Sequence, residues 1–491
     1  MNLTRKKYKY QWYQDIYEKI PAILSDAVQI GEALGLPKLQ GQLGLYSGAS
    51  SCPANLPDYV LDAIVEANHK PILPLRKVED ELREVVKDMY GDAYDAAVTN
   101  TCEASLRVAF DTLCAPPMMR KGDAYRGRVI CPYGEDYEWG AGYGRAFPPR
   151  YKNLSIDRTV TGGELGVEGK SLNNLDSVFV RYAGTTYEVH GVKQNVIPLM
   201  TRTDVDGTLE NIRIACDRHV SMLTGFHIVG YDTPGYGHGT HDANGVPVLF
   251  KEMGKLARSY DVPFIVDAAS CLPGIGLSPE QINADVMMWS MDKAGRSPIA
   301  GLIVGTEESM VTIRKALGLG GHRFGEVSSH SKAVYSIADP GRDAVVGLTA
   351  FLKTLRDTPE RVTDPIDRYH QIIVEEFAEM KPTRFRDKLI ITKSYHMGGT
   401  ELNYEQTWDE GEFGIPLFTI EDLYANTNAI DLAISAMGVS PATIYSGNMF
   451  LGPGLGLLNR QGELIEEYAR LAVKALVKSV ELVCQYAGLG D

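Results

Sequence analysis

The chain has 491 residues, of which 44% are hydrophobic and 23% charged, so its composition is that of a globular protein with a core. These proportions exclude a disordered, collagen-like or fibrous chain. Lys and Arg total 49 against 63 Asp and Glu, and the formal net charge is −14. Because phosphate groups are held by Lys and Arg, this balance disfavours broad binding to nucleic acid or anionic membrane, and we expect neither as a partner.

Seven cysteines are scattered through the sequence, and no two form a CxxC pair. This spacing argues against a zinc ribbon or a redox pair and predicts reduced thiols, as in a cytoplasm. The first twenty residues carry basic side chains but no apolar stretch typical of a secretion signal. No run of about 18 apolar residues occurs, so we expect a cytoplasmic protein without a membrane span.

Residues 1–56 are predicted to form an N-terminal helix and an arm, since the stretch 36–56 is rich in Gly, Ser and Pro. Amphipathic helices are expected over 57–69 and 77–91, and from about residue 92 short apolar runs alternate with helical segments. The expected strands are DAAVT (95–99), RVICP (128–132), SVFVRYA (177–183), FHIVGYD (226–232), PFIVDAA (263–269), DVMMWSM (285–291) and GLIVG (301–305). Near-continuous apolar strands between helices indicate a mainly parallel sheet that is covered on both faces.

After about residue 340 the pattern changes to longer helices with few strands. The expected elements are helices over 341–355, 363–381, 418–438 and 463–488 and a strand over 389–399. We therefore predict an α/β fold with a large three-layer domain over 57–340. A smaller C-terminal α+β domain is expected over 341–491, and the N-terminal helix and arm over 1–56 precede both.

The most informative stretch is VPFIVDAASCLPGIGLSPEQINADVMMWSMDKAGRSPIAGLIVG (262–305), in which two predicted strands end in charged residues. One ends in Asp267, and the other ends near Lys293, 26 residues later. Ligands of open α/β sheets bind at the carboxyl ends of strands. Pyridoxal 5'-phosphate uses just such a pair, because a lysine forms a Schiff base with its aldehyde and a carboxylate keeps its pyridine nitrogen protonated. The alternative is that Asp267 caps the next helix and Lys293 is a solvated loop residue.

The segments IVDAAS, with Asp267, and SMDKAGRSPIAGLIVG, with Lys293, resemble pyridoxal-phosphate enzymes of the aspartate aminotransferase fold (fold type I). They look most like the branch that contains bacterial selenocysteine synthase and the ammonia lyases of phosphorylated amino-sugar acids. The resemblance implies that Ser270 and Ser290 also contact the cofactor. The chain departs from that branch at Met291, where Gly is common, and at Arg296-Ser297, where two glycines are usual. The likeness of fold covers roughly residues 60–350, and the likeness to the branch is limited to a few motifs.

A polar turn follows the predicted strand 95–99, and the helix after it begins near Glu103. In the resembling branch this turn holds the cofactor phosphate, which here implicates Asn100, Thr101, Cys102 and Glu103. A helix N-terminus suits phosphate because its first N–H groups are unpaired. The alternative is an ordinary strand-to-helix turn with Thr101 as the N-cap.

Two loops supply further candidates. Tyr133 and Tyr137 follow a strand end, where resembling enzymes stack a residue on the cofactor; the alternative is that they pack as ordinary loop tyrosines. His238 and His241 lie in a Gly-rich loop that we expect to line the substrate mouth, where either histidine is a candidate proton donor to a leaving group. No third ligand of suitable spacing accompanies these histidines, so we expect no metal.

A substrate carboxylate is best matched by the fork of an arginine, and Arg323 and Arg342 are the candidates. Arg342 alternatively leads the helix predicted over 341–355 as a surface residue. Tyr187 and His190 follow another predicted strand and are weaker candidates for the same mouth.

The resemblance implies a lyase in which Lys293 removes the Cα proton of an amino acid, a β-substituent is eliminated, and a 2-oxo acid and ammonia leave. The residues themselves demand only a Cα carbanion, so an aminotransferase, a racemase or an aldol-cleaving enzyme fits them equally. A selenocysteine-synthase-like transferase acting on aminoacyl-tRNA is a third alternative, against which the net charge of −14 argues. The resemblance also implies a homodimer or larger homo-oligomer.

Overall fold

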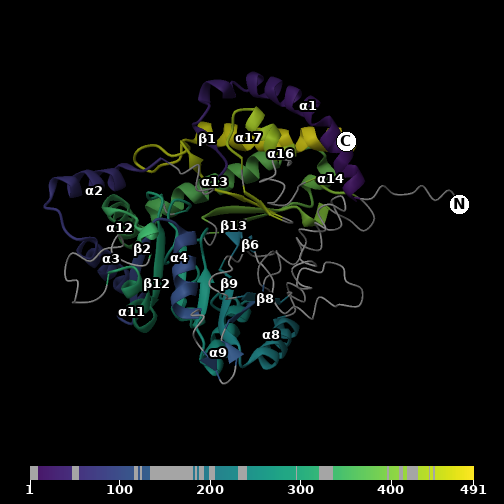
Figure 1. Ribbon diagram of the computed structural model, residues 1–491. Helices are drawn as coiled ribbons and strands as arrows, with labels where there is room; N and C mark the ends of the chain where they lie inside the picture. The colour runs from purple at the N-terminus through teal and green to yellow at the C-terminus, as the bar shows by residue number, and fades with distance from the viewer. Residues whose placement is uncertain are drawn as a thin grey trace.

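The computed structural model of the protein describes residues 9–46, 55–114, 120–121, 124–125, 127–132, 181–182, 185–186, 193–197, 205–230, 240–294, 296–319, 335–394, 398–407, 413–416, 429–441, 443–445 and 448–490. Two sheets organise this part of the chain, a large one in the lower half of Figure 1 and a small one in the upper half.

The large sheet has seven strands and is parallel apart from one strand. In spatial order the strands are β2 (Tyr94–Thr99), β12 (Gly301–Thr306), β11 (Val286–Ser290), β10 (Phe264–Asp267), β9 (Leu223–Val229), β5 (Arg128–Pro132) and β8 (Lys193–Ile197). β12 runs antiparallel to both of its neighbours, whereas β8, β5, β9, β10 and β11 pair in parallel. The predicted mainly parallel sheet is confirmed.

One predicted strand is wrong in its partner, and one strand was not predicted. Within the predicted strand 177–183 the structure describes β6 (Arg181–Tyr182), which pairs with β7 (Thr185–Thr186) in a separate two-stranded sheet. β8 takes the edge of the large sheet instead, and its sequence KQNVI contains too few apolar residues to stand out as a strand. Polar residues suit an edge strand, because one side of such a strand is not covered by a neighbour.

Helices cover the large sheet, since every residue of β10 and β11 is buried. The helices of this unit are α2 (Asp58–His69), α3 (Leu75–Tyr90), α4 (Cys102–Ala109), α8 (Val205–His219), α9 (Val248–Tyr260), α10 (Pro279–Ile282), α11 (Glu307–Ala316) and α12 (Arg342–Asp357). A π-helical turn, η2 (Phe110–Cys114), prolongs α4, a hairpin is formed by β3 (Arg120–Lys121) and β4 (Ala124–Tyr125), and η6 (Ser336–Ala338) precedes α12. α3 and α11 pack on β2, α4 on β11 and β12, and α8 on β5.

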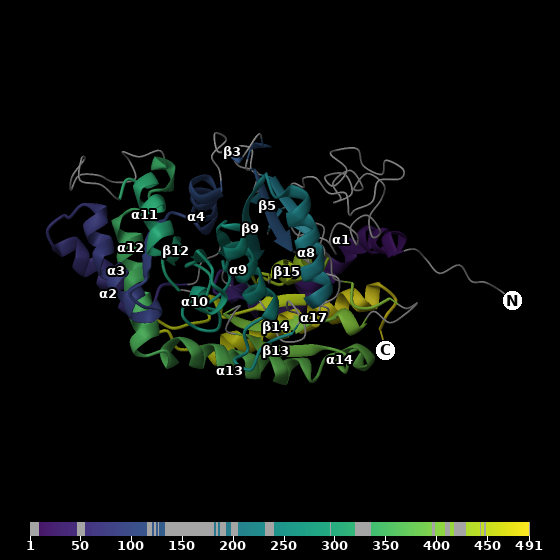
Figure 2. The same cartoon turned by 90° about the horizontal axis from the view of Figure 1, so that it is seen from below.

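The small unit joins the two ends of the chain. Its antiparallel sheet has the order β13 (Ile390–Ser394), β14 (Gly399–Asn403), β16 (Asn448–Leu451) and β15 (Thr443–Tyr445). Its helices are α1 (Lys9–Ala33), α13 (Glu360–Phe377), α14 (Thr383–Arg386), α16 (Ala429–Ala436) and α17 (Glu466–Tyr486), with 3-10 turns η1 (Leu36–Leu39) and η8 (Glu405–Thr407). α1 lies along α17 in Figure 1, and α13 runs beside β13 and β14 in Figure 2.

Two details of the small unit differ from the sequence prediction. The predicted loop 36–56 contains a short strand, β1 (Leu43–Gly44), which pairs antiparallel with β17 (Gly454–Leu455). The predicted strand 389–399 ends at Ser394, and Gly399 already belongs to the next, antiparallel strand. Both segments are short, and a period-two pattern is not resolved over two to five residues.

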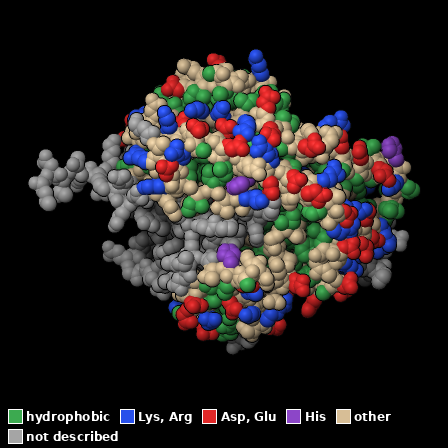
Figure 3. All heavy atoms as spheres, turned by 180° about the vertical axis from the view of Figure 1, so that it is seen from behind, with side chains coloured by type: hydrophobic (Ala, Val, Ile, Leu, Met, Phe, Trp, Pro, Cys, Tyr) green, Lys and Arg blue, Asp and Glu red, His purple; other side chains and the backbone are tan. Residues whose placement is uncertain are grey.

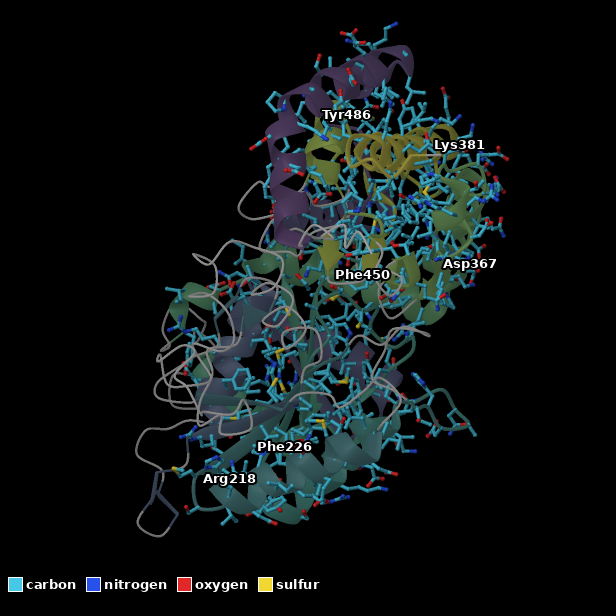
Figure 4. The ribbon with its side chains drawn as sticks, turned by 90° about the vertical axis from the view of Figure 1, so that its right-hand side faces the viewer. Arg218, Phe226, Asp367, Lys381, Phe450 and Tyr486 are labelled. Atoms are coloured by element: carbon cyan, nitrogen blue, oxygen red, sulfur yellow. The ribbon has the colours of Figure 1, made fainter. Side chains whose placement is uncertain are left out.

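The described residues form two hydrophobic cores. The first runs from Val60 to Ile366, and the second combines residues between Ile16 and Leu45 with residues between Tyr369 and Cys484. In Figure 4, Phe226 lies in the lower unit, whereas Phe450 and Tyr486 lie in the upper one. The predicted boundaries after residues 56 and 340 stay predictions.

The surface mixes charges of both signs. On the face shown in Figure 3, Lys and Arg side chains are interspersed with Asp and Glu over the part that the structure describes. Among the described helices, none is long and apolar enough to cross a membrane.

A buried ion pair ties α3, β2 and α11 together at the edge of the large sheet. Arg314 donates to Glu79 over 2.7 Å and to the carbonyl of Ala96 over 2.6 Å. Glu79 is fully buried, and burial raises its pKa to about 7 while Arg314 opposes that shift. The attraction between the two side chains therefore offsets the free-energy cost of burying their charges, and removal of either partner leaves the other as an unpaired buried charge.

We expect Arg314→Met to lower the free energy of unfolding by about 3–5 kcal/mol, because Glu79 is left buried without its cation. The raised pKa of Glu79 means that protonation favours the folded state, so the loss should be smaller at pH 5 than at pH 8. Urea unfolding measures both effects. Arg356→Met, which removes an arginine from exposed pairs with Asp88 and Asp357, is the control and should cost at most about 1 kcal/mol. An Arg314 variant as stable as this control would contradict the prediction.

Candidate functional site

The two predicted strand ends lie side by side at the carboxyl ends of β10 and β11, two central strands of the large sheet. β10 and β11 are parallel neighbours, with Asp267 opposite Met288. Hydrogen bonds continue beyond the strands, from the amide of Ala268 to Met288 O over 2.8 Å and from the amide of Ser290 to Ala269 O over 3.1 Å. Asp267 ends β10 and is buried, and Lys293 lies half-buried in the turn after β11.

The Asp267 carboxylate faces the start of α4. Its Oδ1 accepts a hydrogen bond from the amide of Ala269 over 3.0 Å and lies 4.0 Å from Cys102 Sγ. The pKa of the Cys102 thiol is raised well above its ordinary value, chiefly by burial and next by the charge of Asp267, while the charge of Lys293 acts in the opposite direction. Asp267, Cys102 and Lys293 therefore share one electrostatic environment, and the thiol is neutral within it.

The turn before α4 was predicted either to bind the cofactor phosphate or to be an ordinary turn with Thr101 as the N-cap. Thr101 is the N-cap, since its Oγ1 accepts from the amide of Ala104 over 3.1 Å. Asn100 turns away to η6, because its Nδ2 donates to Ile337 O over 2.7 Å and its amide donates to Ala338 O. Glu103 is exposed in the first turn. Thr101 thus caps the helix, and phosphate binding by this turn stays a prediction.

The neighbouring strand approaches α4 closely because it begins with a glycine. A Cβ atom on Gly301 would lie 2.3 Å from Ser105 Oγ and 2.3 Å from Thr101 O. No side chain fits there, so the glycine sets how closely β12 and the capped end of α4 pack.

The loop that carries Lys293 is held by its own side chains. Ser290 Oγ donates to Asp292 Oδ1 over 2.6 Å, so the hydroxyl is engaged one turn before the lysine. Asp292 is 1% exposed, and its Oδ2 has no hydrogen-bond partner in the described part of the chain. Asp292 was not predicted as a buried group, although its place directly before Lys293 in SMDKAGRSPIAGLIVG was a signal.

A tyrosine from the N-terminal arm reaches this site and was also missed. The Tyr46 phenol is buried next to Ser270 and Asp292, and burial is the main cause of its raised pKa. Its ring lies against Gly452, where a Cβ would be 3.3 Å away, and its backbone lies against Gly454. The GPGLG sequence at 452–456 therefore packs against Tyr46, and this pairing of distant segments has no signal in periodicity.

The remaining candidates are less closely defined. Tyr133, Tyr137, Tyr187, His190, His238 and Arg323 lie outside the described residues. His241 forms a short bridge with Pro247 at the approach to α9. Arg342 starts α12, where it donates to Asp343 over 3.2 Å and to Asn68 at the end of α2. Within the described ranges, no group of three His, Cys, Asp or Glu side chains is arranged to hold a metal ion.

Known structures match the chain over most of its length. One is "D-Glucosaminate-6-phosphate Ammonia-lyase", with 15% identity and a TM-score of 0.45, covering 87% of this chain and 92% of that one. The SepCysS–SepCysE N-terminal domain complex matches with 13% identity and a TM-score of 0.49, over 90% of this chain and 95% of that one. Pyridoxamine-pyruvate aminotransferase from Mesorhizobium loti matches with 15% identity and a TM-score of 0.47, over 91% and 93%. No protein-family model and no curated protein matches the sequence.

We expect Gly301→Ala to lower the melting temperature by several degrees and to displace the start of α4, because its new Cβ collides with Thr101. Cys102, protected in the wild type by burial and a raised pKa, should then react with a thiol reagent, as peptide mass spectrometry would show. Gly305→Ala is the matched control, since its Cβ would meet Val286 at 2.5 Å at the other end of β12. Equal labelling of Cys102 in the two variants would refute this role of Gly301.

Proposed function

We infer the function from the site, because the structural matches have 13–15% identity and TM-scores below 0.5. We propose that the protein binds pyridoxal 5'-phosphate through Lys293 and acts as a lyase on an amino acid, by way of a carbanion at Cα. The observation that carries the proposal is the convergence of Asp267, Lys293 and the start of α4 at the carboxyl ends of β10 and β11. Open α/β sheets bind their ligands at the carboxyl ends of their strands.

The residues fit this cofactor in donor chemistry. Lys293 supplies a primary amine, and Asp267 supplies a buried carboxylate that suits a protonated ring nitrogen. Thr101, Cys102 and Glu103 surround the N-terminal end of α4, which favours a phosphate. When bound, the cofactor supplies an electron sink for a negative charge at Cα.

The chain's own groups then have separate tasks. We propose that Lys293 moves the proton at Cα, since its amine is the basic group of the loop after β11. Asp267 holds a proton at the ring nitrogen, and the neutral Cys102 thiol next to it leaves the aspartate as the negative charge of that pair. Ser290 and Asp292 keep the Lys293 loop in position through their 2.6 Å hydrogen bond.

The reaction after proton removal is chosen by resemblance. We propose β-elimination, in which the β-substituent leaves with a proton from His238 or His241. Water then hydrolyses the released enamine, through its imine form, to a 2-oxo acid and ammonia. Arg323 and Arg342 are the proposed ligands of the substrate carboxylate, and Tyr133 and Tyr137 the residues that stack on the cofactor. An aminotransferase is the main alternative, and a cytoplasmic homodimer or larger homo-oligomer is the proposed state.

Lys293→Ala should abolish covalent attachment of the cofactor and turnover, because the amine and the Cα base are removed together. In the wild type, borohydride should fix the cofactor to the peptide that contains Lys293, and a label on another lysine would refute the assignment.

Asp267→Asn should keep the fold and lower turnover by orders of magnitude. Asp285→Asn is its control, since this buried aspartate bonds the amide of Phe264 at the opposite end of the same strands and should affect stability alone.

The reaction type is tested with a panel of β-substituted amino acids and no added amino acceptor. A lyase should release ammonia and a 2-oxo acid in equal amounts, with Lys293→Ala as the inactive control. Product that forms only when a 2-oxo acid acceptor is added, with conversion of the bound cofactor to its pyridoxamine form, would identify an aminotransferase instead.

A further inference from the structure

The loop after β11 carries a second cation, and this one is buried. Arg296 follows Lys293 by three residues, and the residue is only 6% exposed. It stands at a position where the resembling branch usually has glycine. Its Nε and Nη1 are buried and have no hydrogen-bond partner in the described part of the chain. Burial lowers the pKa of Arg296 to about 10, so the guanidinium still carries its charge at neutral pH.

No described carboxylate forms an ion pair with Arg296, although the chain has 63 acidic residues against 49 basic ones. The ionisable group that acts on it is Tyr59, at the start of α2. Burial raises the pKa of Tyr59 to about 12, so its phenol is neutral at pH 7 and does not balance the charge. Buried cations in proteins are otherwise paired, and here the partner is missing from the described residues.

The backbone at Arg296 is costly as well. Its φ is +45°, in the left-handed region that favours glycine. Ser297 fixes this turn, because both its amide and its Oγ donate to Met291 O over 3.1 Å. A glycine would relieve the strain and the burial of charge together. Backbone strain at a non-glycine residue, where glycine would adopt the same conformation without strain, is typical of ligand-binding sites.

We propose that Arg296 binds an oxyanion, a carboxylate or phosphate group of the ligand held at the Lys293 loop. The guanidinium offers planar N–H donors that match such groups. The proposal rests on the proposed function in one respect, since it takes the ligand to be the one that Lys293 binds. The oxyanion has two possible sources, the phosphate of the cofactor and an acidic group of the substrate.

Arg361 shows what an ordinary arginine does beside the same tyrosine. Its guanidinium carbon lies 4.8 Å from the centre of the Tyr59 ring, it is exposed, and its Nη2 donates to Gln461 O over 3.4 Å. It therefore has a partner and contact with solvent, whereas Nε and Nη1 of Arg296 are buried without a partner in the described part of the chain. Arg361→Gln is accordingly a matched control, because it removes one positive charge next to Tyr59 without opening a buried site.

The test compares melting temperatures of the full-length protein in inorganic phosphate, acetate and chloride at equal ionic strength. The wild type should be stabilised by phosphate or acetate beyond chloride, and Arg296→Gln should lose this response while Arg361→Gln keeps it. Without added oxyanion, Arg296→Gln should melt at or above the wild-type temperature, because an uncompensated buried charge has been removed. Arg296→Lys keeps the charge but not the planar fork, and should respond more weakly than the wild type.

The dissociation constant of pyridoxal 5'-phosphate then identifies the source. An increase of about tenfold or more in Arg296→Gln assigns the cofactor phosphate, and an unchanged value with a lost oxyanion response assigns a substrate group. The proposal is overturned if no oxyanion stabilises the wild type beyond chloride, or if Arg296→Gln melts much lower and responds as the wild type does. Lys293→Ala separates the two proposals. It should still be stabilised by the oxyanion beyond chloride, so a failure to attach the cofactor at Lys293 would not by itself contradict the role of Arg296.

Discussion

The parallel pairing of β10 with β11 is the constraint on which the site depends. Because Asp267 lies opposite Met288, both strands end at the same side of the sheet. The hydrogen bonds from the amides of Ala268 and Ser290 then hold together the two segments that follow the strands. A shift of one residue would turn every side chain of β11 to the other face. Both faces of that strand are buried, so such a shift would place each side chain in a space that is packed around a different one. The capped start of α4 and the loop with Lys293 and Arg296 are both positioned from this pair.

That loop combines three charges within five residues, and it supplies its own support. Asp292 is held by Ser290, and the turn at Arg296 is held by Ser297 on Met291 O. These bonds are local, but the small unit also touches the loop, since a Cβ atom on Gly398 would lie only 2.2 Å from Ala294 Cβ. Tyr46 is a second contact from outside the large sheet, because it brings the N-terminal arm next to Ser270 and Asp292. The site therefore combines residues at the strand ends of the large sheet with residues from the N-terminal arm and the small unit.

The sequence was sufficient for six of the seven strands of the large sheet and for the place of Asp267 and Lys293, because buried strands are short apolar runs and the charged residues stand at their ends. β8 was missed, since the residues of an edge strand need not be apolar. Tyr46 and the GPGLG segment could not be paired from the sequence, because their contact joins residues about 400 positions apart and depends on close backbone approach. The unpaired state of Arg296 was also out of reach, since a pattern shows a charge but not what surrounds it in space.

The joining of the chain ends in the small unit has a consequence for synthesis. The apolar face of α1 packs on α16 and α17, Lys19 Nζ donates to Tyr486 O over 2.7 Å, and Tyr486 donates to Asp26 over 2.8 Å. At roughly 5–20 residues per second, a ribosome needs roughly 20–90 s to make the roughly 450 residues that separate α1 from α17. The last strand of the large sheet ends at Thr306, so that sheet is complete in sequence before either α16 or α17, on which α1 packs, has been made. A nascent chain of this protein thus carries the apolar face of α1 without its two helical partners until α16 and α17 have been made.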